Sequence, residues 1–60
     1  NLISYVTAMR MDYARRLLAD RRYSIGEISA MSGYEDARYF AKLFKKKTGF
    51  TPSEYRNLKT

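Results

Sequence analysis

Apolar residues recur every three to four positions along most of this chain, which is the spacing of one face of an α-helix. The first such run extends from Asn1, a favourable N-cap residue, to about Arg21. No glycine or proline interrupts it, so a helix of this length would extend about 30 Å and could separate two folded units. Its expected buried face comprises Leu2, Val6, Met9, Tyr13 and Leu17, with Ile3, Ala14 and Leu18 beside them.

A second, shorter helical pattern runs from Ser24 to Ser32. Ser24 is followed three positions later by Glu27, the arrangement of a capping box at a helix start. Ile25 and Ile28 are expected to point inward, with Met31 beside that face. The sequence therefore predicts a short helix that begins immediately after Ser24.

A turn and a third helix follow. Gly33 tolerates the positive φ that such a turn requires, and Ser29 is small enough for two helices to cross closely. Asp36 is expected to cap a helix over 37–48, and Gly49 to end it. Helix, glycine turn and basic helix together predict a helix-turn-helix of the DNA-binding kind.

The third helix has an apolar side and a basic side. The apolar side consists of Phe40, Leu43 and Phe44. The opposite side, over an arc of about 140° at 100° per residue, consists of Ala37, Arg38, Ala41, Lys42 and Lys45. Tyr39 and Lys46 flank the basic side, whereas Lys47 falls on the apolar side with a stem long enough to lie along it.

The chain ends with a fourth pattern. Thr51 and Glu54 form a second capping box around Pro52, which suits the first position of a helix. Tyr55 and Leu58 are its expected buried residues, and the helix is expected to pack behind the basic helix. Tyr5 and Tyr13 are likewise expected to be core residues of the first helix.

The amino-acid composition favours a protein that binds a polyanion over an enzyme. Twelve lysines and arginines against six acids give a net charge of +6. The chain contains neither cysteine nor histidine, so thiol nucleophiles, imidazole bases and the usual zinc ligands are missing. We therefore expect no enzyme, no metal site and no cofactor. No apolar run reaches the ~18 residues of a membrane span.

These motifs together resemble the C-terminal part of the AraC/XylS-type DNA-binding domain. The matching segments are Tyr5-Val6, Met9-Arg10-Met11, Ala14, Leu17-Leu18, Ile25, Glu27-Ile28-Ser29, Gly33-Tyr34, Tyr39-Phe40, Phe44-Lys45-Lys46, Gly49 and Thr51-Pro52-Ser53-Glu54-Tyr55-Arg56. Ser29 stands where the family usually has alanine, and Tyr34 where phenylalanine is commoner. The resemblance covers nearly the whole chain, and its last block is the most specific.

The resemblance implies an all-α, homeodomain-like helix-turn-helix with a long linker helix before it and a short packing helix after it. Residues 1–22 would be the helix that joins two helix-turn-helix units, and residues 23–60 the second unit. The first unit and a regulatory domain would lie outside this chain, which begins with Asn1 rather than methionine and is interpreted as a fragment of a bacterial, cytoplasmic protein. The other expected partners are double-stranded DNA and RNA polymerase. We expect no association with a membrane.

A helix inserted in the major groove reads base edges with side chains near its N-terminal half. Arg38 and Lys42 are the predicted readers of guanine O6 and N7, while Ala37 and Ala41 permit close approach or touch a thymine methyl group. Predicted phosphate contacts are Ser24, Ile25, Tyr39, Lys45 and Lys46.

Two alternatives compete with DNA binding. A helix-turn-helix repurposed for protein–protein interaction should expose an apolar patch on the third helix, where this sequence has cations and small residues. A membrane-surface helix would need bulky apolar residues opposite the lysines and no partner helices, whereas the capping boxes and the turn glycine favour a folded unit.

Overall fold

A computed structural model describes residues 1–58, and these residues form four α-helices and no strand. The helices are α1 (Leu2–Leu18), α2 (Ile25–Met31), α3 (Ala37–Thr48) and α4 (Pro52–Leu58). The predicted all-α class, with a long helix before the helix-turn-helix and a short one after it, is confirmed. The last two residues of the predicted second unit, 59 and 60, lie outside the described residues.

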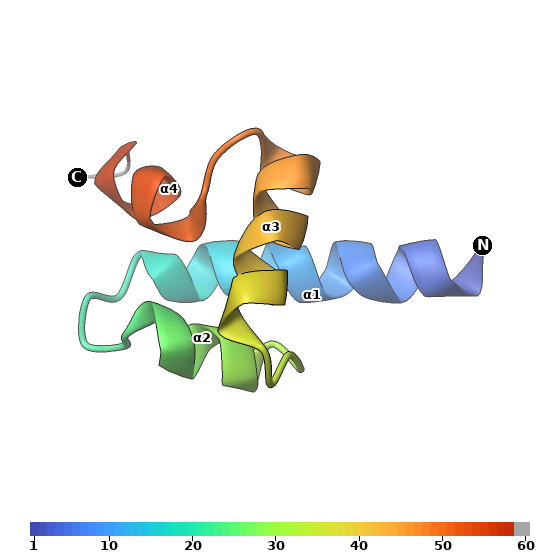
Figure 1. Ribbon diagram of the computed structural model, residues 1–60, viewed down its shortest axis with the longest axis horizontal. Coiled ribbons are helices and arrows are strands. Elements are labelled where there is room, and N and C mark those ends of the chain that lie inside the picture. The colour runs from blue at the N-terminus through green and yellow to red at the C-terminus, as the bar shows by residue number, and fades with distance from the viewer. Residues whose placement is uncertain (59–60) are drawn as a thin grey trace.

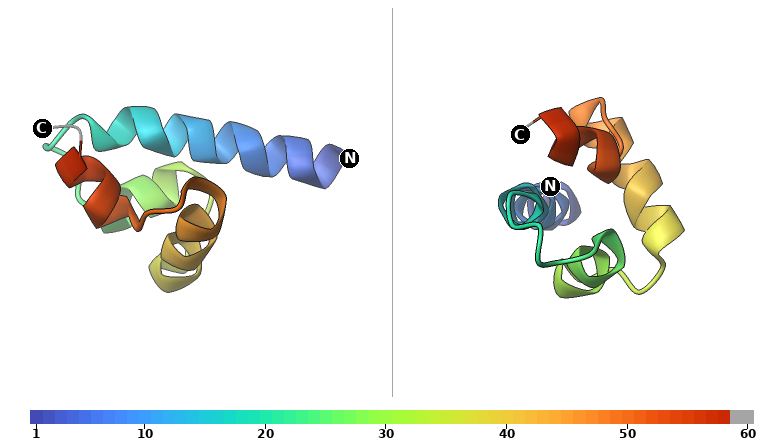
Figure 2. Two further views of the ribbon diagram at one scale, coloured as in Figure 1. Left: turned by 90° about the horizontal axis from the view of Figure 1, so that it is seen from above. Right: turned by 90° about the vertical axis from the view of Figure 1, so that its left-hand side faces the viewer.

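The three shorter helices surround one side of α1. Figure 1 shows α3 crossing the C-terminal half of α1, with α2 below α1 and α4 above it, both toward the C-terminal end of α1. The end-on view in Figure 2 shows the same arrangement around the α1 axis. In both figures the N-terminal end of α1 extends past the other helices, and the buried residues of α1, Met11, Ala14 and Leu18, lie in its C-terminal half.

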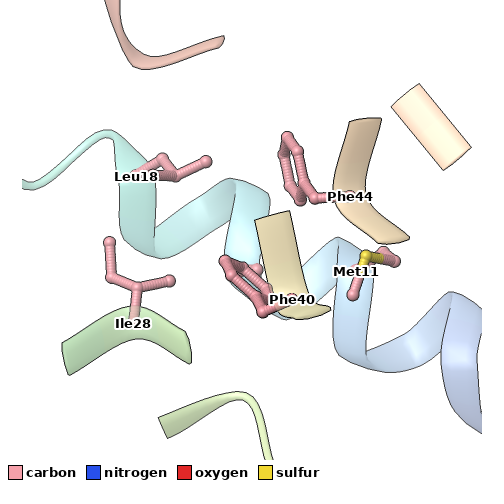
Figure 3. Close-up of a cluster of buried hydrophobic side chains, with 6 residues drawn as sticks. Met11, Leu18, Ile28, Phe40 and Phe44 are labelled. Carbon is pink, nitrogen blue, oxygen red and sulfur yellow. The ribbon is translucent and has the colours of Figure 1, made fainter. Parts of the chain in front are cut away.

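The core lies where α1, α2 and α3 meet (Figure 3). Phe40 and Phe44 of α3 are fully buried, with ring centroids 5.8 Å apart. Burial of side chains of this size contributes about 1.5–3 kcal/mol each. The expected inward position of Phe40, Phe44 and Ile28 is confirmed, and Leu43 is half-buried against the same cluster. The buried apolar residues are Met11, Ala14, Leu18, Ile28, Phe40 and Phe44.

The expected buried face of α1 was right for Ala14 and Leu18, which are buried, and for Leu17, which packs against the core, but wrong for Leu2, Met9 and Tyr13. Leu2, Met9 and Tyr13 are 76%, 54% and 41% exposed, whereas Met11 and Ala14 are 4% and 0% exposed. At 100° per residue these two sets lie roughly 150° apart around the helix. α1 therefore carries two apolar stripes, and spacing alone does not tell which of them meets the described helices.

Three further residues expected in or beside the core are exposed instead. Tyr5, 63% exposed, lies near the N-terminal end of α1, which extends past the other described helices. Met31 and Leu58, 42% and 59% exposed, are the last residues of the short helices α2 and α4. Tyr55, by contrast, is half-buried and packs edge-on against Phe44, with ring centroids 5.5 Å apart.

The predicted helix starts are confirmed. The Asn1 side chain accepts the Ser4 amide at 2.9 Å, and Ser24 and Glu27 form a complete capping box. Thr51 and Glu54 form the second box, with hydrogen bonds of 2.8 and 3.1 Å. Side chains within three residues of each amide therefore determine where these helices begin.

α1 ends at Leu18, earlier than the expected Arg21. The Asp20 carboxylate accepts the backbone amide of Arg22 at 3.0 Å and binds the Arg22 guanidinium at 2.7–3.2 Å. This short-range pairing stabilises a turn in place of a further helical turn.

Hydrogen bonds from Arg56 connect α4 to the C-terminal end of α1 and to the turn that follows it. Its Nε donates to the Leu18 carbonyl at 3.0 Å, and its Nη2 donates to the carbonyls of Asp20 and Tyr23 at 3.2 and 2.8 Å. The Leu18 carbonyl is at the C-terminal end of α1, where a cation is favoured by the helix dipole. No local sequence pattern predicts this contact, because the partners are 33 to 38 residues apart.

Candidate nucleic-acid interface

The turn between α2 and α3 determines where α3 emerges. Gly33 has φ of +97°, as the turn prediction required. Ser29 is 1% exposed, and its hydroxyl donates to the Tyr34 carbonyl at 2.7 Å. The sequence predicted only its small size, so the hydrogen bond that closes the turn is a further role of this residue.

The start and end of α3 follow the prediction. Asp36 Oδ1 accepts the amides of Arg38 and Tyr39 at 2.9 and 3.2 Å, and helix begins at Ala37. Gly49 ends the helix with φ of +89°. The residues before and after α3 therefore define a twelve-residue helix held against the core by Phe40 and Phe44 on one side.

The predicted DNA-contacting residues of α3 share its outer side. Ala37, Arg38 and Lys42 are exposed, as base-reading residues must be. Ala41 is partly buried, which suits close helix approach better than a contact of its own. Of the predicted phosphate contacts, those on α3 are all exposed: Tyr39, Lys45 and Lys46.

The charge of α3 is not neutralised within the described residues. α3 carries five cations and no acid. The ion pairs found in residues 1–58 join Asp12 to Arg15 and Arg16, and Asp20 to Arg22, so none involves α3. The pKa of Glu54 lies below its ordinary value, mainly through hydrogen bonds from Thr51 and to a smaller extent through the charge of Lys45.

The predicted phosphate contact at the start of α2 has weaker support. The Ser24 amide already donates to Glu27 Oε1 at 2.8 Å, and the Ser24 hydroxyl accepts the Glu27 amide at 3.1 Å. Ile25, in the first helical position, has an amide without an intrahelical acceptor. The Glu27 carboxylate beside it opposes an incoming phosphate, so this end of α2 is less favourable than α3.

Several other kinds of site find no support in residues 1–58. No group of three or more potential metal ligands occurs there. No helix in this part of the chain is both long and apolar enough to cross a membrane. On α3, Tyr39 is the one large apolar or aromatic side chain that is substantially exposed, which leaves no apolar patch of the kind that a protein-binding helix would present.

Comparison with known proteins identifies related sequences. A model of the helix-turn-helix domain matches residues 1–58. The HTH-type transcriptional activators RhaR of Escherichia coli strain K12 and of Shigella flexneri serotype 5b are each 41% identical over 54 residues, which is 90% of this chain and 19% of theirs. The chain thus spans about a fifth of the length of these relatives. No solved structure shows significant similarity to it.

Proposed function

The chain belongs to the AraC family of helix-turn-helix transcription regulators, which bind DNA and are not enzymes, and we propose that it reads specific sequences with α3 in the major groove. The observation that carries this proposal is the outer side of α3, where cations without ion pairs lie beside two alanines. A groove about 12 Å wide admits one helix of this kind.

Base reading is assigned to the first two turns of α3. Arg38 is suited to donate two hydrogen bonds to guanine O6 and N7, and Lys42, one turn later, to contact the same atoms of a neighbouring guanine. Ala37 and Ala41 let the helix backbone approach the base edges, and Ala37, the more exposed of the two, can touch a thymine methyl group. Exposure of Arg38 and Lys42 without ion pairs supports these roles.

Phosphate contacts are assigned to the flanks of the same surface. Lys45 and Lys46 lie in the last turn of α3, beyond the residues that would reach base edges. Tyr39 is 56% exposed near the start of α3 and can donate its hydroxyl. Ser24 and Ile25 are also proposed to contact phosphate, although the Glu27 carboxylate, which accepts the Ser24 amide, opposes an anion there.

Two substitutions distinguish reading from phosphate binding. Arg38→Ala is expected to cost about 1–3 kcal/mol on the preferred site and to relax discrimination at one base pair. Lys46→Ala is expected to weaken binding to all sequences and to reduce the slope of log K against log salt by about one. Titrations of matched and mismatched duplexes at several salt concentrations measure both. Equal losses for Arg38→Ala on every duplex would contradict its assignment as a reader.

We also propose that residues 1–22 join this helix-turn-helix to a first one that precedes it. The support is the second apolar stripe of α1, which includes Leu2, Met9 and Tyr13 and has no partner among residues 1–58. Burial of these side chains against a first unit would stabilise both units. The proposed second unit comprises residues 23–60, with α4 as its packing helix.

Leu2→Glu combined with Met9→Glu tests this division. In the native protein the pair is expected to lower the free energy of unfolding by several kcal/mol, because two charges would be buried. In residues 1–60 alone it should change little, since both positions are exposed there. Equal effects in both forms would contradict the proposal.

The wider role proposed for the protein follows from its relatives. The relatives are named transcriptional activators, and this chain corresponds to 19% of their length. We propose a cytoplasmic bacterial regulator with a separate regulatory domain and with RNA polymerase as a partner. Transcription in vitro with purified polymerase, with and without the native protein, tests the last point. An unchanged transcript level from a promoter that the protein occupies would contradict it.

A further inference from the structure

An arginine of α1 lies against the turn that precedes α3. The guanidinium carbon of Arg10 is 5.2 Å from the centre of the Tyr34 ring, within the range of a cation–π contact. A Cβ atom at Gly33 would lie 3.2 Å from both Cζ and Nε of Arg10. The absence of a side chain at Gly33 therefore lets the guanidinium pack closely over the turn.

The Tyr34 ring extends this contact to the first turn of α3. Its centroid lies 5.7 Å from that of Phe40, which is fully buried, and 6.0 Å from that of Tyr39, which is 56% exposed. Tyr34 thus touches both the core side and the outer side of α3. A continuous series of contacts therefore runs from Arg10 through Tyr34 to Tyr39, which is adjacent to Arg38 in sequence.

We infer that Arg10 is a positioning residue for DNA reading, and that it acts through Tyr34 rather than by binding DNA. This inference rests on the proposed function of α3. Tyr34 lies between α1 and the start of α3, so a displaced ring would shift the first helical turn of α3, which carries Arg38. Arg10 fixes that ring from the α1 side.

The expected effect is selective for specific binding. Hydrogen bonds to base edges tolerate only small displacements of donor and acceptor, whereas phosphate contacts do not depend on sequence and tolerate shifts of the helix. Displaced positions of the turn that become populated when the contact is lost cannot bind the preferred site, so the weakening is at most the free energy of an exposed cation–π contact, about twofold to fivefold. That weakening should appear on the preferred site and not on unrelated DNA.

The test uses five variants of the native protein, measured on its selected site and on a scrambled duplex at several salt concentrations. They are Arg10→Ala, Tyr34→Leu, their combination, Tyr34→Phe and, as a matched charge control on α1, Arg16→Ala. Arg16 is 72% exposed and bonded only to Asp12 in the described residues. Circular dichroism first establishes that each variant is folded.

Arg10→Ala is expected to weaken binding to the selected site about twofold to fivefold beyond any change seen with Arg16→Ala, with the salt slope of the wild type. Tyr34→Phe, which keeps the ring, should match the wild type. In the Tyr34→Leu background, the additional loss from Arg10→Ala should disappear.

Three results would overturn the inference. The first is the same loss from Arg10→Ala in the wild-type and Tyr34→Leu backgrounds, and the second is an equal loss from Arg10→Ala on selected and scrambled DNA. The third is a salt slope that Arg10→Ala lowers by about one, because this would indicate a direct phosphate contact. Failure of the wild-type protein to prefer any sequence would instead contradict the proposed function itself. The two failures are therefore distinguishable within one set of titrations.

Discussion

Replacement of Arg56 by alanine is expected to undock α4 from the end of α1. The side chain donates three hydrogen bonds of 2.8–3.2 Å to main-chain carbonyls. A bond from a charged donor contributes about 1.5–3 kcal/mol. Two of the three bonds share Nη2, and Arg56 is only half-buried, so water can replace part of what is lost. We therefore expect a total of about 2–3 kcal/mol rather than the sum.

That loss is large for a chain of this size. At about 0.05–0.15 kcal/mol per residue, some 60 residues have a free energy of unfolding of roughly 3–9 kcal/mol. A loss of 2–3 kcal/mol should lower Tm by about 8–24 °C, at about 4–8 °C per kcal/mol. Arg56→Lys should recover part of the stability, because it restores the charge but not the forked geometry that spans several carbonyls.

Urea unfolding followed by circular dichroism measures the change. Arg21→Ala is the matched control, since it removes an exposed arginine that forms no hydrogen bond or ion pair found in the described residues. The control should change stability by less than about 0.5 kcal/mol. If Arg56→Ala and Arg21→Ala have the same effect, the three hydrogen bonds do not hold α4 in place and the reasoning is refuted.

Three other substitutions test local features by the same unfolding measurement. Hydrogen bonds from Arg22 lower the pKa of Asp20 to about 2. The ionised carboxylate therefore stabilises the folded state above about pH 4, and this stabilisation is lost as the pH falls to about 2. Asp20→Asn should therefore flatten the decline between these values, and an unchanged decline would contradict the pairing. Ser32→Ala should raise the free energy of unfolding by about 1 kcal/mol, because the buried Ser32 hydroxyl has no hydrogen-bond partner among the described residues; a loss would contradict this. Gly33→Ala should cost about 1–2 kcal/mol from its positive φ and should also displace Arg10; a neutral result would show that the turn relaxes.

Features determined within a few residues were predictable from the sequence. The capping box of Ser24 and Glu27 depends on contacts three positions apart, and Asp36 and Gly49 act on the residues next to them. The two sides of α3 follow from helical periodicity, so its buried phenylalanines and exposed cations were both predicted.

Features that depend on distant parts of the chain were not predictable in the same way. Both apolar stripes of α1 have helical spacing, and only the position of α2 and α3 shows that Met11 and Ala14 face the core. Arg56 and Arg10 look like ordinary basic residues in the sequence. Their partners, the carbonyls at and after the end of α1 and the Tyr34 ring, come close only when the helices pack.

The central claim is that α3 reads base edges in the major groove, and methylation interference at guanine N7 tests it most directly. N7 is exposed in the major groove, where Arg38 and Lys42 would bind it. The native protein should first be used to select its preferred site. Methylation of one or two guanines in that site should then prevent binding, and Arg38→Ala should abolish the sensitivity at one of them. Binding that is unaffected by N7 methylation anywhere in the selected site would contradict the claim.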